Sequence, residues 1–267
     1  MLRITIVGAA GRMGRRLMAL TAEDPELTLA GAVDVAAAHF ADQDAGELAG
    51  VGLLNVPVQA TLDAALLART DAVVDFSAPQ ESLALIEAAV AANVAYVLGT
   101  TGHTPEQKAA IEAAGAKGRL VMAPNFSVGV NTLFVLVEQA AKILGDDYDI
   151  EIVEMHHNKK KDAPSGTAER LGEIAAAARD YDYLTDTAHG RQGLVGARPK
   201  REIGMHSLRG GDVVGDHTVT FATGGERLEL SHKASSRDTF AGGALRAAKF
   251  AATAKPGIYD MKAVLGL

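Results

Sequence analysis

A short apolar run at residues 2–7 leads directly into a glycine-rich turn and then into a helical pattern. Leu2 to Val7 predicts a buried strand, and it is followed by Gly8-Ala9-Ala10-Gly11-Arg12-Met13-Gly14 and a helix over 15–21. At this spacing Gly8 permits a tight turn, Gly11 lets the backbone approach a diphosphate, and Gly14 lets the helix pack closely on the strand. The sequence therefore predicts the first strand, turn and helix of a dinucleotide-binding domain.

An acidic residue ends the second predicted strand. This strand covers residues 27–33, and Asp34 follows it, 20 residues after Gly14, where a carboxylate can accept hydrogen bonds from the adenosine ribose. The next residue is Val35 rather than a cation that could hold a 2′-phosphate, so NADH is favoured over NADPH. Arg12 can reach a phosphate from the helix start, which keeps the use of both cofactors open. The G-x-x-G-x-x-G spelling by itself also fits a structural turn that binds no ligand.

Strands and helices alternate through the rest of the first half. Strands are predicted over 72–77, 95–98 and 120–123, and helices over 81–92 and 105–115. This alternation predicts an α/β fold with a Rossmann-type, doubly wound parallel sheet, whose ligand lies at the carboxyl ends of the strands. The turns at 99–102 and 123–126 fall on that edge, although ordinary turn chemistry also explains each of them alone.

The composition is that of an ordinary globular protein. The 267 residues are 48% hydrophobic, which is enough for two modest domains, and the net charge of -7 argues against binding to nucleic acid. The absence of cysteine fits a reducing cytoplasm, and the isolated histidines show no metal-ligand spacing, so no metal is expected. The first apolar run is too short to span a membrane and shows no cleavage-type signal. We therefore expect a cytoplasmic protein without a membrane partner.

Residues 156–167 bring two histidines, three lysines and a helix start together. Their sequence is His156-His157-Asn158-Lys159-Lys160-Lys161-Asp162-Ala163-Pro164-Ser165-Gly166-Thr167. Residues 149–155 predict a strand before this loop, and residues 167–179 predict a helix after it. Backbone N–H groups at a helix start and the lysine charges favour a carboxylate or phosphate, and an imidazole can donate a proton. The alternative is a solvated loop whose histidines are only polar residues at a strand end.

The regular alternation of strands and helices ends in the second half of the chain. A polar, glycine-rich stretch over 179–205 is expected to be irregular, and residues 217–233 predict a β-hairpin that turns at Gly224-Gly225. A helix over 239–252 is expected to return to the first domain. We therefore predict a dinucleotide-binding domain over 1–127, completed by 237–267, and a second, α+β domain over 128–236 with a mixed or antiparallel sheet.

Six motifs are spread along the chain. They are Gly-Ala-Ala-Gly-Arg-Met-Gly at 8–14, Asp-Phe-Ser at 75–77, Gly-Thr-Thr-Gly at 99–102, Asn-Phe-Ser-Val-Gly-Val-Asn at 125–131, His-His-x-x-Lys-x-Asp-Ala-Pro-Ser-Gly-Thr at 156–167 and His-Lys-Ala-Ser-Ser-Arg at 232–237. Together they resemble the 4-hydroxy-tetrahydrodipicolinate reductase family, historically called dihydrodipicolinate reductase. The resemblance covers essentially the whole chain. It implies an oxidoreductase of the diaminopimelate route to lysine that reduces a cyclic dicarboxylate with NADH or NADPH and releases water.

The resemblance also implies roles for individual residues. His156 would be the acid/base residue and Lys160 the proton donor, while the substrate carboxylate would be held by His157 and by Ser165, Gly166 and Thr167 at the helix start. The residues that would contact the cofactor are Gly8, Ala9, Ala10, Gly11, Arg12, Met13, Asp34, Gly99, Thr100, Thr101, Ala123, Pro124, Asn125 and Phe126. The resemblance further implies a homotetramer built through the sheets of the second domain. Members of the family that favour NADPH can carry Arg after the acidic residue, where this chain has Val35.

Two other functions are compatible with a dinucleotide-binding domain. A different nicotinamide-dependent enzyme, such as an amino-acid dehydrogenase or a semialdehyde reductase, would lack the combination of Lys160 with Ser165-Gly166-Thr167. A regulator that binds the cofactor without turnover should carry a pair of DNA-binding helices or a basic face, and the sequence shows neither.

Overall fold

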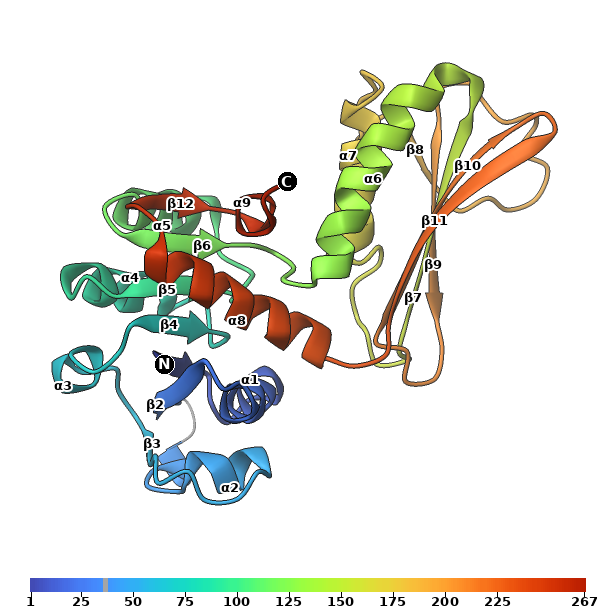
Figure 1. Ribbon diagram of the computed structural model, residues 1–267. Coiled ribbons are helices and arrows are strands. Elements are labelled where there is room, and N and C mark those ends of the chain that lie inside the picture. Colours follow the sequence, from blue (N-terminus) through green and yellow to red (C-terminus); the bar gives the residue numbers. More distant parts are fainter. Residues whose placement is uncertain (36–37) are drawn as a thin grey trace. The chain divides into compact units, whose positions relative to one another are not determined.

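The computed structural model describes residues 1–35 and 38–267, which divide into two compact units (Figure 1). Unit 1 comprises Met1–Val128 and Arg237–Leu267, and unit 2 comprises Gly129–Ser236. The chain therefore leaves unit 1 once and re-enters it after unit 2 is complete.

Unit 1 is built around a parallel sheet. Within the described residues this sheet has seven strands, in the order β12-β6-β5-β4-β1-β2-β3. The strands are β1 (Leu2–Val7), β2 (Leu27–Val33), β3 (Val58–Gln59), β4 (Ala72–Asp75), β5 (Ala95–Leu98), β6 (Arg119–Met122) and β12 (Gly257–Tyr259). β1 pairs in parallel with both β2 and β4, so the strand order reverses there and places the expected ligand edge at the end of β1. The prediction of a Rossmann-type sheet is confirmed.

Helices cover both faces of the unit 1 sheet (Figure 1). They are α1 (Arg12–Glu23), α2 (Ala45–Ala49), α3 (Ala64–Leu67), α4 (Ser82–Ala91), α5 (Pro105–Gly115), α8 (Asp238–Thr253) and α9 (Met261–Leu265). Apolar residues of α1, α8 and α9 form a core on one face, and those of α3, α4 and α5 form a core on the other. Both faces are thus buried, which is why the central strands are almost continuously apolar.

Unit 2 contains a mixed sheet. Among the described residues it has five strands, in the order β11-β10-β7-β9-β8. They are β7 (Asp149–His156), β8 (Thr187–His189), β9 (Ile203–Arg209), β10 (Gly215–Thr223) and β11 (Glu226–Ala234). β9 runs parallel to β7 and β8, whereas β10 runs antiparallel to β7 and β11. The helices α6 (Val128–Leu144) and α7 (Gly166–Ala177) pack on one face, over Ile150, Ile152 and Phe221.

The helical segment Val128–Asp147, which is α6 and the 3-10 turn after it, is long and apolar enough to cross a membrane, by length and composition alone. Its residues Val130, Leu133, Phe134 and Val137 pack in the apolar core of unit 2. A core helix with one buried face meets the same length and hydropathy test, so α6 gives no argument for a membrane partner.

The polar stretch over 179–205 is more ordered than the sequence analysis expected. It contains β8 and the first residues of β9, so the prediction of an irregular segment is wrong at those positions. The hairpin prediction is confirmed, because β10 and β11 pair in antiparallel register. α1 begins at Arg12 rather than after Gly14, and α7 begins at Gly166, one residue before the predicted start.

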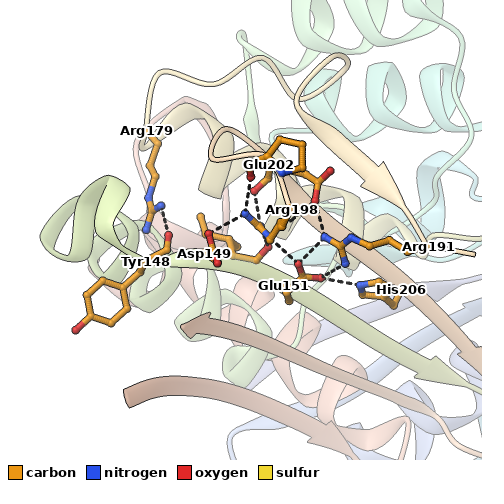
Figure 2. A network of polar contacts seen from close by, with 10 residues as sticks. Tyr148, Asp149, Glu151, Arg179, Arg191, Arg198, Glu202 and His206 are labelled. Carbon is orange, nitrogen blue, oxygen red and sulfur yellow. Dashed lines mark hydrogen bonds and ion pairs between the residues drawn. The ribbon is translucent and has the colours of Figure 1, made fainter. Parts of the chain in front are cut away.

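Arginine side chains fix the loop between β8 and β9 to the sheet, as Figure 2 shows. Arg198 donates to the carboxylates of Asp149 and Glu151 on β7, and Arg191 donates to both carboxylate oxygens of Glu151. Burial raises the pKa of Glu151, but hydrogen bonds from Arg191, His206 and Arg198 outweigh it and lower this pKa to about 2. The loop is therefore held by a charged cluster that stays ionised at neutral pH.

Candidate active site

The glycine turn after β1 has a shape that side chains would prevent. Gly8 has a φ of 79°, and a Cβ atom on Gly14 would clash with the carbonyl oxygen of Gly8. The N–H groups of Gly8 and Ala9 donate to the carbonyl of Val33 at 2.9 and 3.0 Å, which ties the turn to the end of β2. Gly11 precedes α1, and no side chain of the described residues caps that helix. The first turn of α1 can therefore present its N–H groups to a phosphate.

Asp34 lies beside this turn, as expected. It is 9% exposed, and its Oδ2 accepts the N–H of Ala10 at 2.8 Å. The other carboxylate oxygen makes no hydrogen bond within residues 1–35 and 38–267, so an acceptor remains for a ribose hydroxyl. Arg12 and Val35 are both exposed next to these groups in sequence.

Asp75 at the end of β4, which belongs to the Asp-Phe-Ser motif but had no predicted role, is a buried carboxylate that organises the turn after β5. Its oxygens accept hydrogen bonds from the hydroxyls of Ser77, Ser82, Tyr96 and Thr100, at 2.6 to 3.2 Å. Burial, followed by the charge of Asp75, raises the pKa of Tyr96 well above its ordinary value. The hydroxyl of Thr100 also accepts the N–H of Ser77 at 3.0 Å, so Thr100 shapes the 99–101 turn through its side chain.

The predicted cofactor segment at 123–126 packs against the same turn. A Cβ atom on Gly99 would clash with the ring of Phe76, and that ring lies 5.8 Å from the ring of Phe126. Phe126 is buried, and Asn125 fixes the chain beyond it by accepting the N–H of Ser127 at 2.8 Å. Glycine at position 99 therefore lets the turn after β5 lie directly on the aromatic side chain that follows β4.

In unit 2, the strand β7 delivers His156 to the loop, as predicted. His156 is 8% exposed, and its Nδ1 lies 2.6 Å from Oε2 of Glu154, two residues earlier on the same face of the strand. Arg209, which pairs with His156 in the β7–β9 register, donates to both oxygens of Glu154 at 2.8 and 2.9 Å. A carboxylate at Nδ1 places the proton on that nitrogen, so the neutral imidazole presents Nε2 as its proton acceptor.

Lys160 has a carboxylate partner rather than only the lysines beside it in sequence. Its Nζ lies 2.8 Å from Oδ2 of Asp162, and its side chain is 19% exposed. The N–H of Lys160 donates to the carbonyl of His157, and the N–H of His157 donates to the carbonyl of Val213. The loop is thus anchored to the segment that leads into β10.

The start of α7 is capped by Ser165. Its hydroxyl accepts the N–H of Ala168 at 3.2 Å and lies 3.0 Å from Nε2 of His217, and its N–H donates to Glu154 at 3.2 Å. Ser165 is therefore already used to shape the site. Space is open beside Gly166, where no heavy atom lies within 4 Å of the position of a Cβ atom. This leaves Gly166 and Thr167 as the better-placed pair for a carboxylate at the helix start.

Burial and nearby charges set the protonation of the two histidines. Burial lowers the pKa of His156, the carboxylate of Glu154 partly offsets this, and the charges of Lys160 and Arg209 lower it further. His217 is 3% exposed, and its ring meets that of His156 edge to face at 5.2 Å. Burial, followed by the charge of His156, lowers the pKa of His217 to about 4. Both imidazoles are therefore neutral at neutral pH.

The low pKa of His217 predicts a specific loss of stability in acid. In the unfolded chain this histidine has a pKa near its ordinary value of about 6.5, and in the folded protein the pKa is about 4. The contribution of His217 to the free energy of unfolding is therefore fully present above pH 6.5 and is lost as the pH falls from about 6.5 to about 4. We expect His217→Asn to reduce the pH dependence of the free energy of unfolding by about 1.4 kcal/mol per pH unit in this window. Urea unfolding at several pH values measures it.

The control for this comparison is His189→Asn, because His189 is exposed and should leave the pH dependence as in the original protein. Equal slopes for the His217→Asn variant and the original protein would contradict the assignment. His156 and His232 also have lowered pKa values, so they add to the pH dependence of the free energy of unfolding in the same direction. The measured quantity is therefore the difference in this pH dependence between the variant and the original protein.

The structure thus groups the predicted residues into two sets, one in each unit. The cofactor set of unit 1 comprises Gly8, Ala9, Ala10, Gly11, Arg12, Met13, Asp34, Gly99, Thr100, Thr101, Ala123, Pro124, Asn125 and Phe126, all on segments that follow the carboxyl ends of β1, β2, β5 and β6. The set of unit 2 comprises His156, His157, Lys160, Ser165, Gly166 and Thr167. Five further residues support these sets from within each unit and had no predicted role, although two of them stand in the motifs at 75–77 and 156–167. They are Asp75, Glu154, Asp162, Arg209 and His217.

Comparison with known proteins identifies the family. The family models described as the N-terminus and C-terminus of dihydrodipicolinate reductase match residues 2–126 and 129–265. A 4-hydroxy-tetrahydrodipicolinate reductase from Syntrophotalea carbinolica is 50% identical over 267 residues, covering all of both chains. One from Anaeromyxobacter sp. strain Fw109-5 is 52% identical over all of this chain and 98% of its own length.

A solved structure agrees at the level of the fold. The dipicolinate-bound dihydrodipicolinate reductase from Paenisporosarcina sp. TG-14 has a TM-score of 0.78 and 24% identity, over 98% of this chain and 99% of that one. A probable dehydrogenase from Thermotoga maritima has a TM-score of 0.64 and 12% identity, over 98% of this chain and 92% of that one. Since both family models together match nearly the whole chain, the protein belongs to the dihydrodipicolinate reductase family of oxidoreductases.

Proposed function

We propose that the protein reduces 4-hydroxy-tetrahydrodipicolinate to tetrahydrodipicolinate with loss of water, using NADH or NADPH, in the diaminopimelate route to lysine. The observation that most supports this is the loop of unit 2, which holds a histidine whose Nδ1 contacts a buried carboxylate, a lysine and a helix start within one short segment. Relatives about 50% identical over the full length are named for this reaction. The dipicolinate in the Paenisporosarcina structure is a dicarboxylate, the class of ligand expected here.

The residues of this chain would divide the chemistry between them. The bound nicotinamide supplies a hydride. Reduction of an unsaturated ring builds negative charge that a proton must neutralise, and we assign Lys160 as the proton donor. His156, with its Nδ1–H held by Glu154, would accept or return a proton at Nε2. Gly166 and Thr167 would bind a substrate carboxylate through the helix start, with His157 beside them.

The test is a steady-state assay that follows nicotinamide oxidation with the substrate generated in situ. NADH and NADPH are supplied separately, and the product is identified by mass. Turnover with either cofactor is the expected result. A folded protein that binds cofactor but does not consume this substrate would contradict the proposal and would favour another nicotinamide-dependent reaction.

We further propose that NADH is the preferred cofactor. One carboxylate oxygen of Asp34 accepts no hydrogen bond among the described residues, and burial followed by the charges of Asp75 and Asp34 raises the pKa of Glu81. A 2′-phosphate would meet this negative field without a cation at position 35. A cytoplasmic setting fits the absence of cysteine.

The substitution Val35→Arg should shift the preference toward NADPH. A guanidinium at this exposed position can pair with the 2′-phosphate, and one charged hydrogen bond changes a ratio of affinities by roughly tenfold. The measured quantity is the ratio of kcat/KM for NADPH to that for NADH. Leu184→Arg adds the same charge on unit 2 and should leave the ratio unchanged. A ratio equally unchanged in Val35→Arg would place the 2′-phosphate elsewhere.

We also propose a homotetramer assembled through the sheet of unit 2. Within the described residues, α6 and α7 cover one face of this sheet, and alternate residues such as Val153, Met155, Thr218 and Thr220 lie on the other. A sheet face of this kind is buried most readily against a second copy of itself. Light scattering coupled to gel filtration measures the mass, and a monomer at micromolar concentration would contradict this part of the proposal.

A further inference from the structure

We infer that Arg209 is a positioning residue that fixes both proton-handling side chains, His156 and Lys160, through two separate contacts of one guanidinium. This inference rests on the proposed function, because it concerns how the same site orients its acid and its base. The side chain of Arg209 reaches Glu154 with two nitrogens and the backbone of Asp162 with one.

The first contact acts on His156 through Glu154. This carboxylate is 1% exposed and accepts Nη1 and Nη2 of Arg209 at 2.8 and 2.9 Å, Nδ1 of His156 at 2.6 Å and the N–H of Ser165 at 3.2 Å. Burial raises the pKa of Glu154, but the hydrogen bonds from Arg209 and His156 outweigh it and bring the pKa below its ordinary value. An ionised Glu154 can only accept, so it holds the proton of His156 on Nδ1 and leaves Nε2 as the reactive nitrogen.

The second contact acts on Lys160 through Asp162. Nη2 of Arg209 donates to the carbonyl oxygen of Asp162 at 2.6 Å, and the side chain of the same Asp162 binds Nζ of Lys160 at 2.8 Å. Arg209 therefore fixes the backbone of the residue that orients the proposed proton donor. Strand pairing reinforces this arrangement, because Arg209 lies opposite His156 and the next N–H, that of Gly210, donates to the carbonyl of His156 at 2.9 Å.

Only a planar guanidinium group, with its several N–H donors, can make both contacts of Arg209 at the same time. Arginine presents five N–H groups in a fixed plane, whereas a lysine ammonium at the same place can satisfy one carboxylate as a point charge. The groups with charge that face His156 are Glu154, Arg209 and Lys160, and the neutral ring of His217 lies against it. Loss of the Arg209 charge should therefore raise the pH at which His156 becomes protonated.

The proposal predicts a defined pattern in two variants. Arg209→Lys keeps the charge and loses the planar guanidinium, and Arg209→Met loses both. In each, kcat should fall roughly tenfold to a hundredfold, because displacement of a reacting group by about 1 Å has an effect of this size. The Kd for NADH, which depends on unit 1, should not change. The acidic limb of the kcat profile should move to higher pH in Arg209→Met and remain in place in Arg209→Lys.

A matched control is Arg201→Met, also in unit 2. Arg201 likewise binds one carboxylate and one backbone carbonyl, those of Asp186 and Asp180, and within residues 1–35 and 38–267 its hydrogen bonds reach no residue of the site. It should keep the original kcat and pH profile. If Arg209→Met and Arg209→Lys do the same, the proposal is overturned.

A measurement on the unmodified protein remains decisive even if the variants fail to fold. Nitrogen NMR of the histidine side chains at neutral pH should show His156 protonated on Nδ1 and not on Nε2. The opposite tautomer would overturn the inference. This readout needs no turnover, so it also separates the two proposals. Inactivity of the original protein would refute the function, and the tautomer would still test the first contact, in which Arg209 acts on His156 through an ionised Glu154.

Discussion

Lys160→Ala is expected to remove most of the turnover while leaving NADH binding intact. Lys160 is the proposed proton donor, and a positioned general acid contributes about 10² to 10⁴ in rate. Its side chain is 19% exposed and is oriented by Asp162, so it is held in one place rather than solvated like a surface lysine. The measured quantities are kcat from nicotinamide oxidation and the Kd for NADH from a titration without substrate.

The neighbouring Lys161 provides the control. Lys161→Ala removes an equal charge from the same loop, but Lys161 is exposed. Because screening weakens such a charge, we expect a change in KM for the dicarboxylate and a kcat within about twofold of the original value. Similar losses of kcat in both variants would mean that the loop acts only through its total positive charge, and that proton donation by Lys160 is wrong.

The glycine turn of unit 1 could be predicted because its signals are local in sequence. Gly8, Gly11 and Gly14 stand within one turn, and the turn joins a strand to a helix. Even here one boundary was misplaced. The helical run was predicted over 15–21, whereas α1 begins at Arg12. In the structure Gly14 lies inside α1, where a Cβ atom would clash with Gly8.

The contacts that support the 156–167 loop could not be predicted because they depend on strand register. Arg209 is 55 residues from Glu154, and they meet only because β9 runs parallel to β7 with Arg209 opposite His156. β9 itself gives a weak strand signal, since Gly204 interrupts its apolar run. The structure explains this glycine, because a Cβ atom there would clash with the carboxylate of Glu151. Gly204, which weakens the strand signal in the sequence, is therefore the residue that makes room for the charged cluster of Figure 2.

Gly14→Ala is expected both to destabilise unit 1 and to weaken the binding of NADH. The added methyl group would collide with the carbonyl oxygen of Gly8 and lie 2.7 Å from the Cα of Ala9, so it meets backbone atoms that cannot rotate away. Overpacking against rigid backbone should cost about 3 kcal/mol or more, which exceeds the gain of about 1 kcal/mol in helix propensity. The turn that is proposed to receive the diphosphate must then open. We expect the Kd for NADH to rise by roughly tenfold or more, the result of losing about 1.4 kcal/mol of binding free energy.

A glycine-to-alanine substitution at Gly242 is the control. It separates the effect of the clash with the turn from the general effect of replacing glycine by alanine in a helix. Gly242 lies inside α8, also in unit 1, and no heavy atom lies within 4 Å of the position of its Cβ atom. Gly242→Ala should therefore leave NADH binding unchanged and stabilise the helix by up to about 1 kcal/mol. Urea unfolding and NADH titration of both variants measure the two effects. If Gly14→Ala is as stable as Gly242→Ala, the turn and α1 can move apart without cost. The close packing of helix on strand at Gly14 would then have no role in the proposed binding of the cofactor.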